Sequence, residues 1–158
     1  MSQKIVIERS YRAQLAELWD LWTTKEGFES WWGPEGFRVE VRTLEARAGG
    51  RLEYTMIAEG AAQIAAMKHM GQPLAQAARA RFGELRKDER LTLICLIDFF
   101  PGVEPYETTV AVDFRSAGAS STMVITLEPM HSEQFTHMAR AGWASQLGKL
   151  DRRFAQST

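Results

Sequence analysis

Residues 132–154, SEQFTHMARAGWASQLGKLDRRF, form the stretch of sequence that decides the fold. Apolar side chains recur in it every three or four positions, at Phe135, Ala139, Trp143, Leu147, Leu150 and Phe154. This spacing predicts a helix with one apolar stripe, and Ser132 is a suitable N-cap for that helix. A helix of about 22 residues is roughly 33 Å long, which is enough to cross a whole sheet.

Upstream of this helix the hydrophobic period is two, which is typical of half-buried antiparallel strands. In residues 51–56, for example, Leu52, Tyr54 and Met56 share one face, and polar side chains share the other. Seven strands are expected, at Lys4–Arg9, 37–42, 51–56, Ala78–Leu85, Leu91–Phe99, Glu107–Arg115 and Ser121–Glu128. A sheet of this width is able to curl around the long helix.

Two short helices are expected after the first strand. The first carries an apolar stripe made of Leu15, Leu18, Trp19 and Trp22, which predicts ordinary core packing for both tryptophans. Thr23 and Glu26 have the spacing of a capping box, so a second helix is expected at about Lys25–Ser30. A further helix is predicted inside an insertion at 60–76, because the chain is alanine-rich there and Gly71 precedes a proline.

Composition sets the class of protein. The chain has 158 residues, a net charge of -1 and one cysteine, Cys95. We therefore expect a single domain over 1–158 that has no internal disulfide and does not coat nucleic acid. No apolar run approaches the ~20 residues of a membrane span, and no signal-peptide core follows the N-terminus. A cytoplasmic location is the expectation.

Together these elements predict an α+β fold. A curved seven-stranded antiparallel sheet wraps around the long C-terminal helix, the short helix pair closes one end, and the helical insertion lies between strands.

Several motifs carry a resemblance to a known family over nearly the whole chain. They are 18–23 LWDLWT, 31–37 WWGPEGF, Gly49-Gly50, 89–91 ERL, 126–131 TLEPMH and 142–150 GWASQLGKL. In these motifs the chain resembles the helix-grip superfamily of START-like and birch-pollen-allergen-like domains, also called SRPBCC. Within it, the chain resembles the group named after the activator of the heat-shock-protein-90 ATPase. The resemblance implies a hydrophobic cavity between the sheet and the terminal helix.

Strand alternation and the resemblance both place one set of bulky side chains inward. The expected cavity wall consists of Tyr54, Met56, Phe99, Phe135, Met138 and Trp143. Asp98 and His131 are the polar groups expected to orient a ligand there. A completely filled core is the alternative. Gly142 either leaves room for a ligand or allows close packing against a strand.

The expected function is binding of a small hydrophobic molecule, without a cofactor. One alternative is a partner-binding module acting on a chaperone ATPase, as the resemblance suggests. Another is a cyclase or aromatase-like enzyme that uses an acid or histidine inside the cavity. No catalytic residue and no metal site are assigned, since the histidines are scattered and Cys95 lies among apolar residues. The insertion at 60–76 is a lid, a permanent plug or a homodimer contact.

Overall fold

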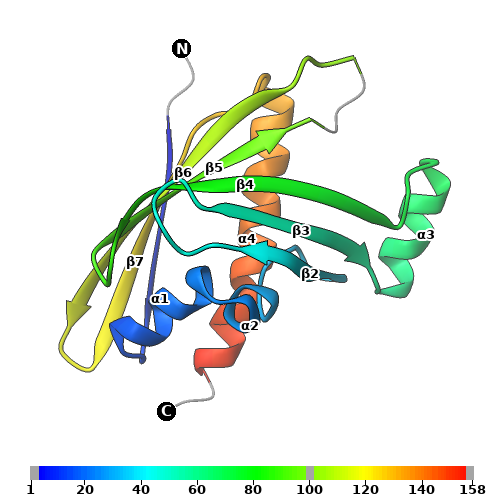
Figure 1. Cartoon of the computed structure of the whole chain (residues 1–158). Helices are drawn as coiled ribbons and strands as arrows, with labels where there is room; N and C mark the ends of the chain where they lie inside the picture. The colour runs from blue at the N-terminus through cyan, green and yellow to red at the C-terminus, as the bar shows by residue number, and fades with distance from the viewer. Residues whose placement is uncertain (1–3, 99–101, 156–158) are drawn as a thin grey trace.

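The computed structural model describes residues 4–98 and 102–155 of the chain. Its seven strands are β1 (Ile5–Tyr11), β2 (Phe37–Leu44), β3 (Arg51–Ala58), β4 (Ala75–Arg86), β5 (Arg90–Ile97), β6 (Tyr106–Ala117) and β7 (Ser120–Leu127). Its four helices are α1 (Leu15–Thr23), α2 (Lys25–Glu29), α3 (Ala61–His69) and α4 (Glu133–Ala155). The predicted α+β helix-grip architecture is confirmed, because one antiparallel sheet holds all seven strands and α4 crosses it (Figure 1).

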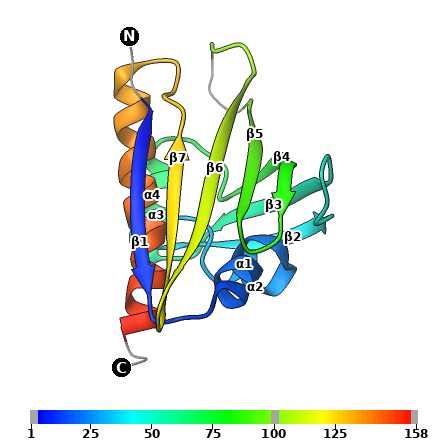
Figure 2. The same ribbon diagram turned by 90° about the vertical axis from the view of Figure 1, so that its left-hand side faces the viewer.

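The strand order is β1-β7-β6-β5-β4-β3-β2, so β1 and β2 lie at opposite edges of the sheet. Strands β2 to β6 each pair with the next strand along the chain. β1 instead pairs with β7, beginning with Ile5 opposite Leu127. Figure 2 shows β1 alongside β7, with α4 running along the same side of the sheet. The α1–α2 pair therefore carries the chain from one edge to the other.

Buried and exposed side chains alternate along the strands, so the two faces of the sheet differ in character. On β6, Val110, Val112 and Phe114 are buried. Asp113 lies between two of them and faces outward, where it is ion-paired with Arg90 on β5 at 2.8 Å. The inner face therefore forms the core, and charged side chains on the outer face pair across neighbouring strands.

The α1–α2 junction corrects one detail of the sequence prediction. Thr24, not Thr23, caps α2: its Oγ1 accepts a hydrogen bond from the Gly27 N–H at 3.0 Å. Thr23 is still the last residue of α1, and its hydroxyl donates to the Trp19 carbonyl at 2.9 Å. A cap needs a backbone that has left the helix, and Thr24 is extended (φ -122°, ψ 153°).

The tryptophans near this junction form the centre of the core. Trp22 and Trp31 are fully buried, and their ring centroids lie 5.0 Å apart. The Trp31 indole N–H donates to the Leu21 carbonyl at 2.8 Å. The prediction that Trp22 packs in the core is confirmed, and Trp31 packs there with it.

α4 has two different halves. The predicted cap is present, since the Ser132 hydroxyl accepts from the Phe135 N–H at 3.2 Å. The buried residues of α4 are all in its second half: Gln146, Leu147, Leu150 and Phe154. There Tyr11 donates to Asp151 at 2.6 Å and its ring stacks on Phe154. The second half thus anchors the helix, and the first half lies over the sheet without being buried.

The predicted helical insertion is present as α3. It joins β3 to β4 and stands beyond their far ends, apart from α4 (Figure 1). None of its nine residues is buried, so α3 contributes nothing to the core.

Candidate functional site

A pocket lies between the first half of α4 and strands β3 to β6, with a volume of about 340 Å³. Its lining consists of Trp32, Pro34, Tyr54, Met56, Ala78, Arg79, Cys95, Leu96, Ile97, Thr108, Val110, Met130, Phe135, Met138, Ala139, Gly142, Trp143 and Gln146. Most of these side chains are apolar. They come from the turn after α2, from strands β3 to β6, from the segment before α4 and from α4 itself. The pocket lies beside the part of α4 that is not buried, since the buried residues of this helix begin at Gln146.

The structure brings together five of the six side chains expected to form the wall. Tyr54, Met56, Phe135, Met138 and Trp143 all border this pocket. Met138 is 54% exposed, which places it at the opening. The sixth, Phe99, lies outside the described residues. A role in ligand binding stays a prediction for all six.

The two expected polar orienters do not line the pocket. Asp98 is exposed, because β5 ends at Ile97. His131 is also exposed, and its Nδ1 lies 2.7 Å from the Tyr106 hydroxyl. The His131 ring is 4.6 Å from that of Phe135, so it is near the pocket rim without entering the lining. The described lining contains neither an acid nor a histidine, and the condition for a cyclase-like site is not met there.

Gly142 resolves an alternative that the sequence leaves open. Among the described residues, a Cβ built on Gly142 would meet no heavy atom within 4 Å beyond its own helix turn and neighbours. Gly142 lines the pocket, so the glycine borders empty space rather than a strand. No described strand packs closely against Gly142.

Two polar side chains of the pocket lining, Tyr54 and Gln146, accept hydrogen bonds from neighbouring residues of one turn. The sequence pattern does not predict that these two side chains lie near the same turn. The Trp32 indole N–H donates to the Tyr54 hydroxyl at 3.1 Å. The next residue, Gly33, donates its backbone N–H to Gln146 Oε1 at 3.0 Å. Gln146 is only 5% exposed. Gln146 lies beside the apolar stripe and not in it, since the stripe continues from Trp143 to Leu147, so the sequence pattern contains no signal for its burial.

Burial changes the acid–base properties of two lining residues. It raises the pKa of the Tyr54 hydroxyl, so this group stays protonated at neutral pH. It also raises the pKa of the Cys95 thiol to about 12, although the sulfur side chain keeps some exposure. Cys95 is therefore a small apolar wall residue and not a nucleophile.

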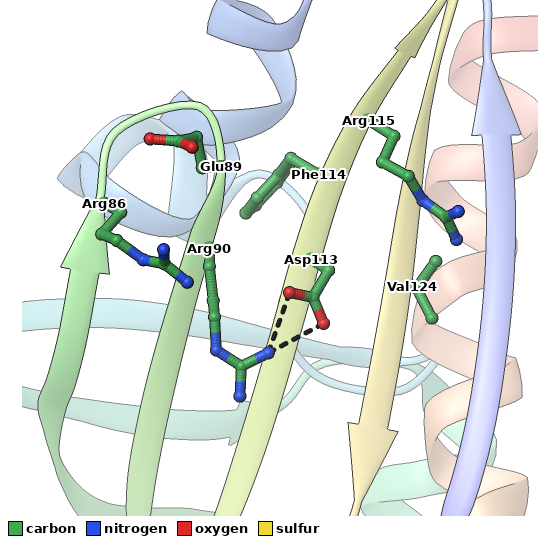
Figure 3. A pocket seen from close by; sticks show the side chains of 7 residues that line it. All are labelled: Arg86, Glu89, Arg90, Asp113, Phe114, Arg115 and Val124. Carbon is green, nitrogen blue, oxygen red and sulfur yellow. Dashed lines mark hydrogen bonds and ion pairs between the residues drawn. The ribbon is translucent and has the colours of Figure 1, made fainter.

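A larger hollow of about 490 Å³ lies on the outer face, lined by Arg86, Glu89, Arg90, Asp113, Phe114, Arg115 and Val124 (Figure 3). Four of its charged side chains are already ion-paired within the chain: Arg86, Arg90, Asp113 and Arg115. Arg90 Nη1 lies 2.8 Å from both Asp113 oxygens, and Arg86 is paired with Glu84 at 2.7 Å. We therefore favour the apolar pocket as the functional site, despite its smaller volume.

Residues 4–98 and 102–155 contain neither a metal-binding cluster nor a membrane-spanning helix. No cluster of three or more histidine, cysteine, aspartate or glutamate side chains is placed to hold a metal ion. No helix in these ranges has the length and apolar character needed to cross a membrane.

Comparison with known proteins supports the fold over the whole chain. A protein from Chromobacterium violaceum has a crystal structure with a TM-score of 0.74 and 20% identity, over 96% of each chain. A protein from Silicibacter pomeroyi gives a TM-score of 0.75 at 15% identity, over 99% of this chain and 100% of the other. A protein from Arthrobacter aurescens gives 0.72 at 21% identity, over 97% and 86%.

No significant match was found among the curated proteins. The family model described as Activator of Hsp90 ATPase homolog 1-like protein matches residues 12–155. That span holds α1 to α4 and all strands except β1. The chain belongs to the family of Activator of Hsp90 ATPase homolog 1-like proteins.

Proposed function

We propose that this protein binds a small hydrophobic molecule in the pocket between α4 and the sheet. The observation that carries the proposal is the pocket itself, a partly open space of about 340 Å³ with a largely apolar lining. The second half of α4 already packs in the core and anchors the helix. Stability of the fold therefore does not require an empty space of this size beside the first half of α4. A cytoplasmic location, expected from the sequence, is part of the same proposal.

The chemistry of the wall favours an adaptable, apolar site. Met56, Met130 and Met138 contribute flexible thioethers, which adjust to ligands of different shape. A ligand of about 20 heavy atoms at about 0.3 kcal/mol per atom gains roughly 6 kcal/mol, a dissociation constant of tens of micromolar. Apolar contacts alone therefore give modest affinity, and polar contacts decide which ligand is preferred.

The test is native mass spectrometry of the protein purified from its own cells. We expect a mass above that of the chain, corresponding to a bound small molecule. Gly142→Leu places an isobutyl group toward the pocket and should remove this species. Gly148→Leu is the matched control on the same helix, since Gly148 does not line the pocket. A wild-type protein without bound mass, or a bound mass that Gly142→Leu retains, contradicts the proposal.

A second candidate function is binding of a protein partner through α3. This helix has no buried residue, and Met70 at its C-terminal end is 60% exposed. The family to which the chain belongs suggests a chaperone ATPase as the partner. The test is the ATPase rate of a heat-shock-protein-90 chaperone with and without the chain. An increase that Met70→Glu reduces supports this function, and an unchanged rate excludes it.

A further inference from the structure

Only one of the two polar atoms of the Gln146 side-chain amide has a hydrogen-bond partner among the described residues. Its Oε1 accepts from the Gly33 N–H at 3.0 Å. A backbone N–H only donates, so the oxygen must face Gly33 and the NH2 group must point elsewhere. Within the described part of the chain, Nε2 has no acceptor. Asp88 Oδ1 is the one fully buried side-chain nitrogen or oxygen there without a partner, so Nε2 keeps some accessible surface. Gln146 is a lining residue of the pocket.

The Tyr54 hydroxyl is in a similar position. It accepts from the Trp32 indole N–H at 3.1 Å, and an indole N–H also only donates. The hydroxyl proton of Tyr54 therefore remains available, and no acceptor for it is found among the described residues. Because burial raises its pKa, the group is a donor throughout the physiological range. Tyr54 is 8% exposed and lines the same pocket as Gln146.

These two donors are held by consecutive residues of one turn. Trp32 orients Tyr54, and Gly33 orients Gln146. Gly33 has φ +93°, a conformation that side-chain-bearing residues rarely adopt, so the turn geometry depends on glycine. Two lining residues of a largely apolar pocket thus carry hydrogen-bond donors without an acceptor among the described residues.

The charges around the pocket limit what these donors can bind. Arg79 is the one cation on the described lining, but it is exposed and alternates with the inward-facing Ala78 and Ala80. A buried carboxylate facing Tyr54 and Gln146 would therefore lack a countercharge, which is costly. A pure hydrocarbon would leave both donors unsatisfied. Thr108 also lines the pocket, and its hydroxyl serves either as donor or as acceptor.

We infer that the ligand carries a neutral carbonyl oxygen, as in a ketone, ester or amide, which accepts hydrogen bonds from Gln146 Nε2 and Tyr54 Oη. The rest of the ligand is apolar and fills the space toward Met138. This inference rests on the proposed function, because it names the class of ligand for the same pocket.

The experiment compares two neutral probes in fluorescence titrations. One is Prodan, a naphthyl ketone dye, and the other is the same naphthylamine with a propyl group in place of the propionyl group. Wild-type protein should bind the ketone more tightly. Tyr54→Phe should weaken ketone binding about 3- to 10-fold, the effect of one hydrogen bond, and leave the propyl compound unchanged. Emission of the bound ketone should also shift to the blue, because its carbonyl loses a donor.

Gln146→Glu is the second variant, because it keeps an oxygen for the Gly33 N–H and removes the NH2 donor. Tyr11→Phe is the matched control, since it removes a buried tyrosine hydroxyl that does not line the pocket. Thermal unfolding shows whether each variant is folded. Equal binding of both probes, unaffected by Tyr54→Phe and Gln146→Glu, overturns the carbonyl inference and leaves the apolar pocket standing. Binding of neither probe contradicts the proposed function itself.

Discussion

Replacing Gly142 by alanine tests whether the space beside α4 is empty. Glycine inside a helix costs about 0.5–1 kcal/mol relative to alanine. At Gly142 the added methyl group meets no heavy atom of residues 4–98 and 102–155 within 4 Å, so no repulsion from them offsets this gain. We expect Gly142→Ala to raise the free energy of unfolding by about 0.5–1 kcal/mol. For a chain of this length, the unfolding midpoint should rise by about 1–4 °C.

The assay is urea unfolding of the ligand-free protein, followed by circular dichroism, together with thermal melting. Gly148→Ala is the control, because its methyl group would make an ordinary contact, 3.7 Å from Arg152 Nη1. Both variants gain the same helix propensity, so their stabilities should rise equally in the absence of ligand. With a ligand bound, the gain from Gly142→Ala should shrink, because the methyl group occupies ligand space.

A specific result would refute this reasoning. If Gly142→Ala destabilises the ligand-free protein and Gly148→Ala stabilises it, a neighbouring group occupies the space beside Gly142. The pocket would then be closed in solution.

Three other changes have defined outcomes. Thr24→Ala removes the α2 cap and should lower the free energy of unfolding by about 0.5–2 kcal/mol in urea titrations, and no change would show that the cap bond is not stabilising. Tyr11→Phe removes the hydrogen bond to Asp151 and should cost about 1 kcal/mol by the same measurement, unless that bond is absent in solution. Cys95, whose thiol pKa is raised to about 12, should react with iodoacetamide at pH 8 at least about a hundredfold more slowly than in urea. Its rate should rise with pH until about 12, and fast alkylation of the folded protein at pH 8 would contradict the assigned burial.

The fold could be predicted from local patterns, whereas the polar part of the site could not. The apolar stripe from Phe135 to Phe154 and the period-two strands each indicate which face is buried. The sheet and α4 could therefore be predicted from these local patterns. Gln146 needs a partner 113 residues away, at Gly33, and no local pattern contains that information. Asp98 was expected to orient a ligand, but β5 ends at Ile97 and the Asp98 side chain is exposed outside the pocket lining.

The α1–α2 junction shows how one residue changes a local prediction. Capping-box spacing identified Thr23 as the cap, but the spacing alone does not say where the preceding helix ends. Thr23 remains helical and is buried, so the cap moves to Thr24. The position of a cap depends on the packing of both helices it separates.

The position of β1 in the sheet has a consequence for how the chain folds. Ile5 pairs with Leu127, which lies 122 residues later in the sequence (127 minus 5). During synthesis, the first strand is made early but has no neighbour until the last strand has been completed. Pairings of such long range raise the contact order, which slows folding. The chain must lose the entropy of closing a large loop before any hydrogen bond between the two strands can form. The six strands from β2 to β7 pair locally and can assemble first. The first strand of the chain is then the last to join the sheet.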